Sequence, residues 1–86
     1  MNSIKVTFYP PISSITQVSH IYLEFETGKT LEEIEIILGE LFPKLNTVTN
    51  NFSYVYYIYK ENIVTNKTMV VELGSEINLL QPLSGG

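Results

Sequence analysis

The residues best suited to chemistry lie at the C-terminal end of the chain. Pro82 and Leu83 lead into a final Ser84-Gly85-Gly86. Glycine has no Cβ, so such an end can enter a channel that is too narrow for other residues and can adopt conformations barred to them. The terminal carboxylate of Gly86 is ionised at neutral pH and must be activated, for instance as an acyl-adenylate, before a sulfur nucleophile can replace the leaving group. No phosphate-binding loop is found in the sequence, so we expect the chain to be the substrate of a separate activating enzyme.

The remaining side chains offer little for catalysis or metal binding. The chain has no cysteine and one histidine, His20, which excludes thiol catalysis and both thiolate and paired-histidine metal sites. Glu32 and Glu33 are better explained as residues of a helix N-terminus than as paired catalytic acids. We therefore expect no metal, no bound cofactor and no catalytic side chain.

Charge and hydropathy limit the partners and the compartment. Five lysines stand against nine glutamates, a formal net charge of −4, which disfavours nucleic acid and favours a basic protein partner. The N-terminal residues lack the pattern of a signal peptide, and no apolar run reaches the roughly 18 residues of a membrane span. With no cysteine present, these features predict a cytoplasmic protein without a membrane anchor.

Three segments alternate between apolar and polar residues and predict β-strands at 4–9, 20–26 and 76–81. Their apolar members are expected to face the core: Ile4, Val6, Phe8, Ile21, Leu23, Phe25, Ile77 and Leu79. The alternate positions, among them Tyr9 and Leu80, are expected to face outward.

The segment 52–60 also predicts a strand, but it is nearly continuous in apolar character, so the pattern leaves open which residues face inward. Residues 63–65 predict a short strand, 69–71 an apolar connection, and 73–75 a turn. The polar stretch 46–51 predicts a loop.

One helix is predicted to begin at Leu31. Thr30 and Glu33 have the spacing of a capping box, and Pro43 is expected to end the helix. Apolar residues at helical spacing predict the face that packs on the sheet: Leu31, Ile34, Leu38 and Leu41, widened by Ile37 and Phe42. The element order predicts an α+β domain over residues 1–80, with one main helix on a mixed sheet, followed by a flexible tail over 81–86.

The whole chain resembles the ubiquitin-like β-grasp sulfur carriers (the MoaD/ThiS family), and most of all the small subunit of molybdopterin synthase. Gly74-Ser75-Glu76-Ile77 resembles the family's Gly-Asp-Glu-Val turn, and the end from Gln81 to Gly86 resembles its Pro-Pro-Val-Ser-Gly-Gly. Residues 10–17 lack the family's Ala-x-x-Arg-Glu-x-x-Gly pattern, and Gln81 replaces its first proline. The identity of the sulfur acceptor therefore stays open.

The resemblance implies a reaction cycle. An E1-like enzyme uses ATP to adenylate Gly86, a sulfur donor converts it to a thiocarboxylate, and the tail enters the large subunit of molybdopterin synthase, where sulfur passes to a pterin precursor. Gly85 and Ser84 would give the tail access. The resemblance also implies partner contacts at Tyr9, Val64 and Leu80, close together on the open face of the sheet, and at Pro82 and Leu83.

Three alternatives stay open beside molybdenum or tungsten cofactor synthesis. The chain could carry sulfur for thiamin or for tRNA thiolation, or it could be a protein modifier that forms isopeptide bonds through Gly86. It could also be a plain β-grasp interaction module.

Overall fold

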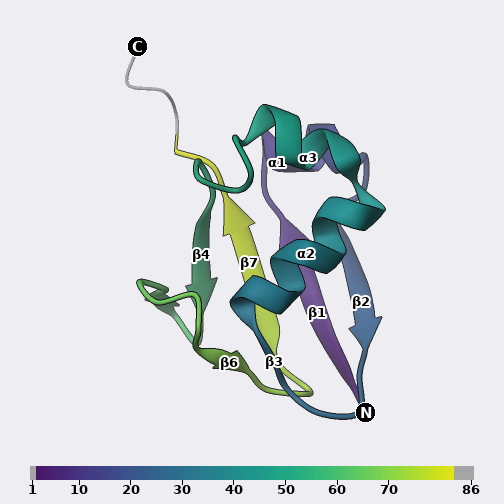
Figure 1. Ribbon diagram of the computed structural model, residues 1–86, viewed down its shortest axis with the longest axis vertical. Coiled ribbons are helices and arrows are strands. Elements are labelled where there is room, and N and C mark those ends of the chain that lie inside the picture. Colours follow the sequence, from purple (N-terminus) through teal and green to yellow (C-terminus); the bar gives the residue numbers. More distant parts are fainter. Residues whose placement is uncertain (1, 83–86) are drawn as a thin grey trace.

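The computed structural model describes residues 2–82. It shows a mixed sheet with helices on one of its faces (Figure 1). The elements, in chain order, are β1 (Ser3–Phe8), α1 (Ile12–Thr16), β2 (His20–Glu24), β3 (Lys29–Thr30), α2 (Leu31–Leu41), α3 (Pro43–Val48), β4 (Tyr56–Tyr59), β5 (Asn62–Ile63), β6 (Val70–Val71) and β7 (Glu76–Leu80).

The sheet has five strands in the order β2-β1-β7-β4-β5, and β3 pairs with β6 in a separate two-stranded sheet. β1 and β7 are parallel neighbours, with Val6 opposite Ile77, whereas the other pairs are antiparallel. The first and last strands thus meet at the centre of the sheet. This α+β architecture with one main helix on a mixed sheet is the fold that the sequence predicted.

The core lies between the sheet and the helices. The residues predicted to face inward on the three alternating strands are buried or pack against the core, and the run 52–60 contributes Phe52, Val55 and Tyr57. Since Tyr57 is buried, Tyr56 and Ile58 lie on the other face of the sheet, which no helix covers. We call this uncovered surface the open face.

The main helix, α2, begins as the sequence predicted. The Thr30 hydroxyl accepts a hydrogen bond from the backbone N–H of Glu33 (3.2 Å), and Glu33 accepts one from the backbone N–H of Thr30 (2.9 Å). Leu31, Ile34 and Leu38 are completely buried. These contacts fix both the start of the helix and the face it presents to the sheet.

The prediction for Leu41 was wrong, because this side chain is 53 % exposed. α2 ends at Leu41, and the next residue, Phe42, takes the place against the sheet. Its ring packs edge-to-face on Phe8, with 5.7 Å between the ring centroids.

The loop expected at 46–51 is also partly wrong, since α3 continues through Val48. Pro43 suits the first turn of a helix, where its missing N–H costs nothing, and Leu45 is buried. The polar character of this stretch suggested a loop, but the side chain of Asn46 donates a hydrogen bond to the carbonyl of Gly39 within the protein (3.3 Å). α1, in the segment after Pro11, is a further short helix that periodicity did not reveal.

The strand predicted over 52–60 is limited to β4. Three successive residues, Asn50, Asn51 and Phe52, have positive φ angles (53°, 53° and 68°), so the chain makes a left-handed turn there and cannot be extended. The Thr49 hydroxyl stabilises this turn by accepting from the backbone N–H of Phe52 (3.0 Å).

Candidate functional site

The functional prediction centres on the tail that follows β7. Leu79 is buried, Leu80 and Gln81 are partly exposed, and Pro82 is the last described residue. The predicted site residues Leu83, Ser84, Gly85 and Gly86 lie outside the described residues. The part of the site that can be described is therefore the sheet around the base of the tail.

Apolar side chains gather on the open face at this base. Leu80 lies opposite Tyr56, Ile58 lies opposite Ile63, and the backbone N–H of Tyr9 donates to the carbonyl of Leu79 (3.1 Å), which continues the pairing of β1 with β7. We call Tyr9, Tyr56, Ile58, Ile63 and Leu80 the open-face patch. Tyr56 and Ile63 are 54 % and 65 % exposed. Exposed apolar side chains that lie next to one another on a folded domain often mark a binding surface.

The sequence prediction named two of these residues correctly as outward, Tyr9 and Leu80, but was wrong about the position of Val64. Lys60 and Glu61, with φ angles of 51° and 68°, form a two-residue hairpin loop that places Tyr59 opposite Asn62. The backbone N–H of Val64 consequently bonds to the carbonyl of Tyr57 (2.9 Å), and its side chain packs against the core. Ile63 occupies the open face instead.

Tyr56, Ile58 and Ile63 were missed as candidate contact residues. Alternation could not identify them, because the run from Tyr54 to Tyr59 is apolar on both faces. The turn signal that would have fixed the register, Asn-Gly or Asp-Gly, is absent, since Lys60 and Glu61 occupy the two loop positions.

On β1 and β7 the open face is polar away from the tail. Lys5, Thr7 and Glu76 lie on β1 and β7, and the Thr7 hydroxyl donates to Glu76 (2.5 Å). Between this polar region and the open-face patch lies Asn78, whose Oδ1 atom is buried and has no hydrogen-bond partner among the described residues. On β1, β7 and β4 the apolar side chains of the open face thus gather at the end from which the chain leads to Pro82, whereas Tyr22 on β2 is an exposed ring away from that end.

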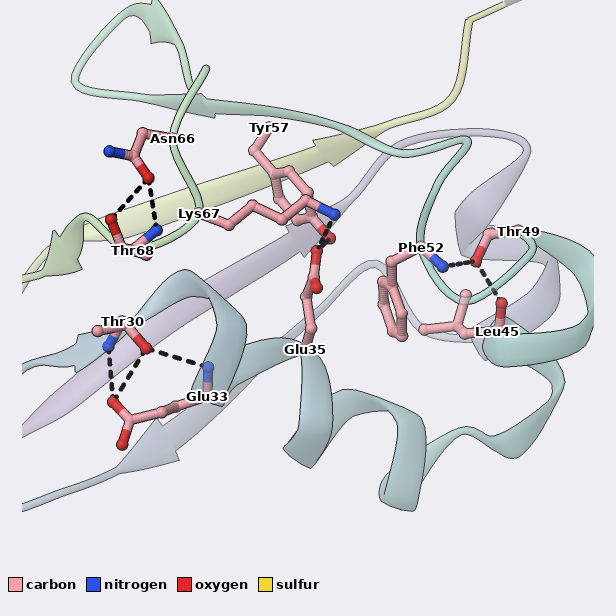
Figure 2. A network of polar contacts seen from close by, with 10 residues as sticks. All are labelled: Thr30, Glu33, Glu35, Leu45, Thr49, Phe52, Tyr57, Asn66, Lys67 and Thr68. Carbon is pink, nitrogen blue, oxygen red and sulfur yellow. Dashed lines mark hydrogen bonds and ion pairs between the residues drawn. The ribbon is translucent and has the colours of Figure 1, made fainter.

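A polar network lies on the opposite, helix-covered side (Figure 2). The Tyr57 hydroxyl donates to Oε2 of Glu35 (2.5 Å), and the Lys67 ammonium group is 2.9 Å from the same oxygen. Burial, helped by the hydrogen bond to Glu35, raises the pKa of Tyr57 well above its usual value. The phenol therefore stays protonated and connects β4 to α2 and to the loop before β6, which is a structural role.

The other side chains considered for chemistry are accounted for by local structure. His20 is exposed at the start of β2, where its ring is hydrogen-bonded to the Ser19 hydroxyl (3.0 Å). The hydrogen bond from the Thr30 backbone, followed by that from its hydroxyl, lowers the pKa of Glu33, as expected for a capping residue. Among residues 2–82, no group of three or more potential ligands could hold a metal ion.

In the described part of the chain, none of the helices has both the length and the apolar character needed to cross a membrane.

The class of fold follows from this topology and from comparison with solved structures: the chain has the ubiquitin-like β-grasp fold. Small archaeal modifier protein 1 of Haloferax volcanii superposes with a TM-score of 0.82 at 13 % identity, over 98 % of this chain and 99 % of that one. Small archaeal modifier protein 1 of Methanosarcina acetivorans superposes with a TM-score of 0.76 at 17 % identity, over 100 % and 98 % of the two chains.

A third similar structure comes from Pyrococcus furiosus and is provisionally named molybdopterin converting factor, subunit 1. Its TM-score is 0.80 at 11 % identity, over 96 % of this chain and 100 % of that one. Neither a family model nor a curated protein matches the chain by sequence. At these identities the comparisons establish the fold and nothing finer.

Proposed function

We propose that this chain is a ubiquitin-like sulfur carrier, the small subunit of a molybdopterin synthase, which acts through a thiocarboxylate at Gly86 and requires no catalytic side chain of its own. The observation that carries this proposal is the open-face patch, which lies where β7 leads into the tail. A partner that binds the patch would hold the tail at a fixed distance from its own active site. Residues 81–86 span at most about 20 Å when fully extended.

The chemistry requires two steps at the Gly86 carboxyl. Its oxygen attacks the α-phosphorus of ATP in the E1-like partner and pyrophosphate leaves, which gives an acyl-adenylate. A persulfide donor then attacks the carbonyl carbon through its terminal sulfur and AMP leaves. A thiol next attacks the inner sulfur of the resulting acyl disulfide, which releases the thiocarboxylate and leaves the donor as a disulfide with that thiol. Gly85 and Ser84 would supply the narrow tail that both active sites must admit, and Pro82 and Leu83 would contact their entrances.

The charge of the chain suits such partners. Its formal net charge of −4 favours association with a basic surface on the activating enzyme or on the large subunit of the synthase. ATP belongs to the activating enzyme. On this proposal the chain itself binds no cofactor and works in the cytoplasm.

A second candidate is a protein modifier that forms isopeptide bonds through Gly86. It is favoured by the names of the similar structures from Haloferax volcanii and Methanosarcina acetivorans. Both candidates begin with the same adenylation, and they differ in whether sulfur or a lysine amine receives the acyl group.

Intact-mass measurement after incubation with ATP, an E1-like enzyme and a sulfur donor distinguishes these candidate functions. A carrier gains the mass difference between sulfur and oxygen, whereas a modifier gives a ladder of conjugates with other proteins. An unchanged mass under conditions that load a known carrier would favour a plain interaction module.

A further inference from the structure

The outer edge of β2 is a regular strand edge without a partner in the part of the chain that the structure describes. β2 is the terminal strand of the five-stranded sheet, and within the described residues no strand pairs with its outer side (Figure 1). An unpaired edge exposes a row of backbone donors and acceptors. What such an edge can bind depends on which residues direct those groups outward.

The register between β1 and β2 identifies those residues. The backbone N–H of Phe8 donates to Ser19 (2.8 Å) and that of Phe25 donates to Asn2 (2.9 Å), so Ser19 and Phe25 bond toward β1. Hydrogen-bonded and non-hydrogen-bonded pairs alternate along an antiparallel ladder, so Ile21 and Leu23 also bond toward β1. His20, Tyr22 and Glu24 therefore direct their backbone N–H and C=O groups to the free edge.

This edge lacks most of the devices that prevent strand association. It contains neither proline nor lysine, and its register with β1 runs unbroken from His20 to Glu24, so there is no bulge. Glu24 is the only carboxylate on β2. A charge of one sign would repel a second copy, unless the pairing brought it opposite a group that can form a hydrogen bond with it.

Antiparallel pairing of two copies about Tyr22 meets that condition. In this register Tyr22 lies opposite Tyr22 of the second copy, and His20 lies opposite Glu24 of the second copy at both ends. All three outward-directed residues then form hydrogen-bonded pairs, whereas a shift by two residues leaves some of them unpaired. An imidazole facing a carboxylate is a favourable cross-strand pair at both positions.

The side chains also match in this register. On the open face, Tyr22 is 59 % exposed and would lie against its copy. On the helix side, Ile21, which is partly exposed, would lie opposite Leu23 of the second copy. The paired edges thus cover apolar surface on both faces of the sheet.

We propose that the free edge of β2 is a self-association surface, at which a second copy of this chain pairs antiparallel about Tyr22. The sheet would extend from five strands to ten. Four of the five residues of the open-face patch lie on β7, β4 and β5, toward the other edge of the sheet, and stay accessible. The inference is independent of the proposed function, so a chain without Gly86 should associate equally well.

Sedimentation equilibrium of the full chain, from micromolar to millimolar concentration, tests the proposal. The parent chain should form dimers at the upper end. Tyr22→Pro removes an N–H that points to the free edge and leaves the ladder to β1 intact, so it should abolish the dimer while circular dichroism shows a folded domain. Tyr22→Val also removes the ring but keeps the N–H, and it should still dimerise.

The register is tested by charge exchange. His20→Glu places two glutamates opposite each other at both ends, so the dissociation constant should rise about tenfold. The double variant His20→Glu, Glu24→Lys replaces this repulsion with an attraction between opposite charges and should recover the parent value. Failure of the second change to rescue the first would overturn the register about Tyr22.

Amide chemical shifts give a measurement that needs no variant. As concentration rises, the N–H signals of His20, Tyr22 and Glu24 should move, whereas those of Ile21 and Leu23, already bonded to β1, should move less. A chain that is monomeric throughout the concentration range, or a dimer that Tyr22→Pro leaves unchanged, would overturn the proposal.

Discussion

Leu80 on β7 and Tyr56 on β4 lie directly opposite each other on the open face, at the end of the sheet from which the chain continues to Gln81 and Pro82. Leu80 is the last residue of its strand and Tyr56 is the first of its own. The base of the tail is therefore next to exposed apolar surface, and a partner that receives the tail can bind both together.

The first prediction tests this surface with a matched pair of variants. Ile63 in the open-face patch and Ile36 on α2 are 65 % and 64 % exposed and lie on opposite sides of the molecule. Ile63→Glu should lower the kcat/KM of loading by the E1-like enzyme about tenfold, because it buries a carboxylate in the contact. Ile36→Glu adds the same charge and should leave loading unchanged. Equal effects of the two variants would indicate that net charge, and not the patch, determines loading.

The second prediction concerns the helix face. Leu38 is completely buried between α2 and the sheet, so Leu38→Ala should cost about 2–5 kcal/mol in the free energy of unfolding. Leu41→Ala, at a position 53 % exposed, should cost less than about 1 kcal/mol. Urea unfolding of both variants measures the difference. Similar losses would mean that Leu41 contributes to the core after all.

The third prediction concerns the side-chain oxygen of Asn78. This residue lies in a central strand, opposite Thr7 on one side and Ile58 on the other, and its buried Oδ1 atom has no hydrogen-bond partner within residues 2–82. Because an unsatisfied buried acceptor costs about 1–3 kcal/mol and asparagine is a poor strand former, Asn78→Val should raise stability by about 1 kcal/mol. Thermal unfolding checks this. A lower melting temperature would show that the amide makes a stabilising contact in solution.

Much of this architecture could be predicted from the sequence because three strands have one buried and one outward face. Alternation identified the inward positions of β1, β2 and β7, and the capping box placed the first residue of α2. The run containing Tyr56 and Tyr57 gave no such signal, since both faces of β4 carry apolar side chains. Its register depends on the loop at Lys60 and Glu61, which lacks the residues typical of that turn.

The position of Val64 shows how such an ambiguity affects the site. A shift of one residue in a strand exchanges its two faces, so Ile63 rather than Val64 belongs to the open-face patch. The short helix α3 escaped prediction for a different reason. One of its polar side chains, that of Asn46, donates a hydrogen bond to the carbonyl of Gly39, and sequence periodicity does not reveal such a contact.

The fourth prediction concerns how the free energy of unfolding decreases at low pH. The hydrogen bonds from Thr30 hold the pKa of Glu33 below its value in an unfolded chain. A carboxylate with a depressed folded-state pKa stabilises the fold above its unfolded pKa, and that contribution is lost as the pH falls through the folded value. Glu33→Gln keeps an oxygen acceptor for Thr30 but cannot titrate, so its stability should fall less steeply below about pH 4.5. Glu32→Gln, in the same helical turn, is the control, and an equal flattening in both would assign the effect to general charge reduction.

The last prediction separates function from stability. The buried core runs from Ile4 to Leu79, so removing Gly86 should leave the melting temperature within about a degree of the parent. The same deletion should abolish both adenylation and sulfur loading, because the reacting carboxyl would then belong to a tail one residue too short for the active sites that receive it.

Gly85→Val tests whether the narrow tail, as well as its length, is required. A β-branched side chain restricts the backbone and obstructs a channel shaped for glycine, so loading should fall strongly while the fold is retained. Ser84→Ala is the matched control, since it keeps a small side chain at the neighbouring position and should be loaded nearly as well as the parent. Intact mass reports loading, and thermal unfolding reports the fold. If a chain without Gly86 were loaded at the rate of the parent, the carboxyl of Gly86 would not be the reacting group, and a plain interaction module would become the better explanation of this fold.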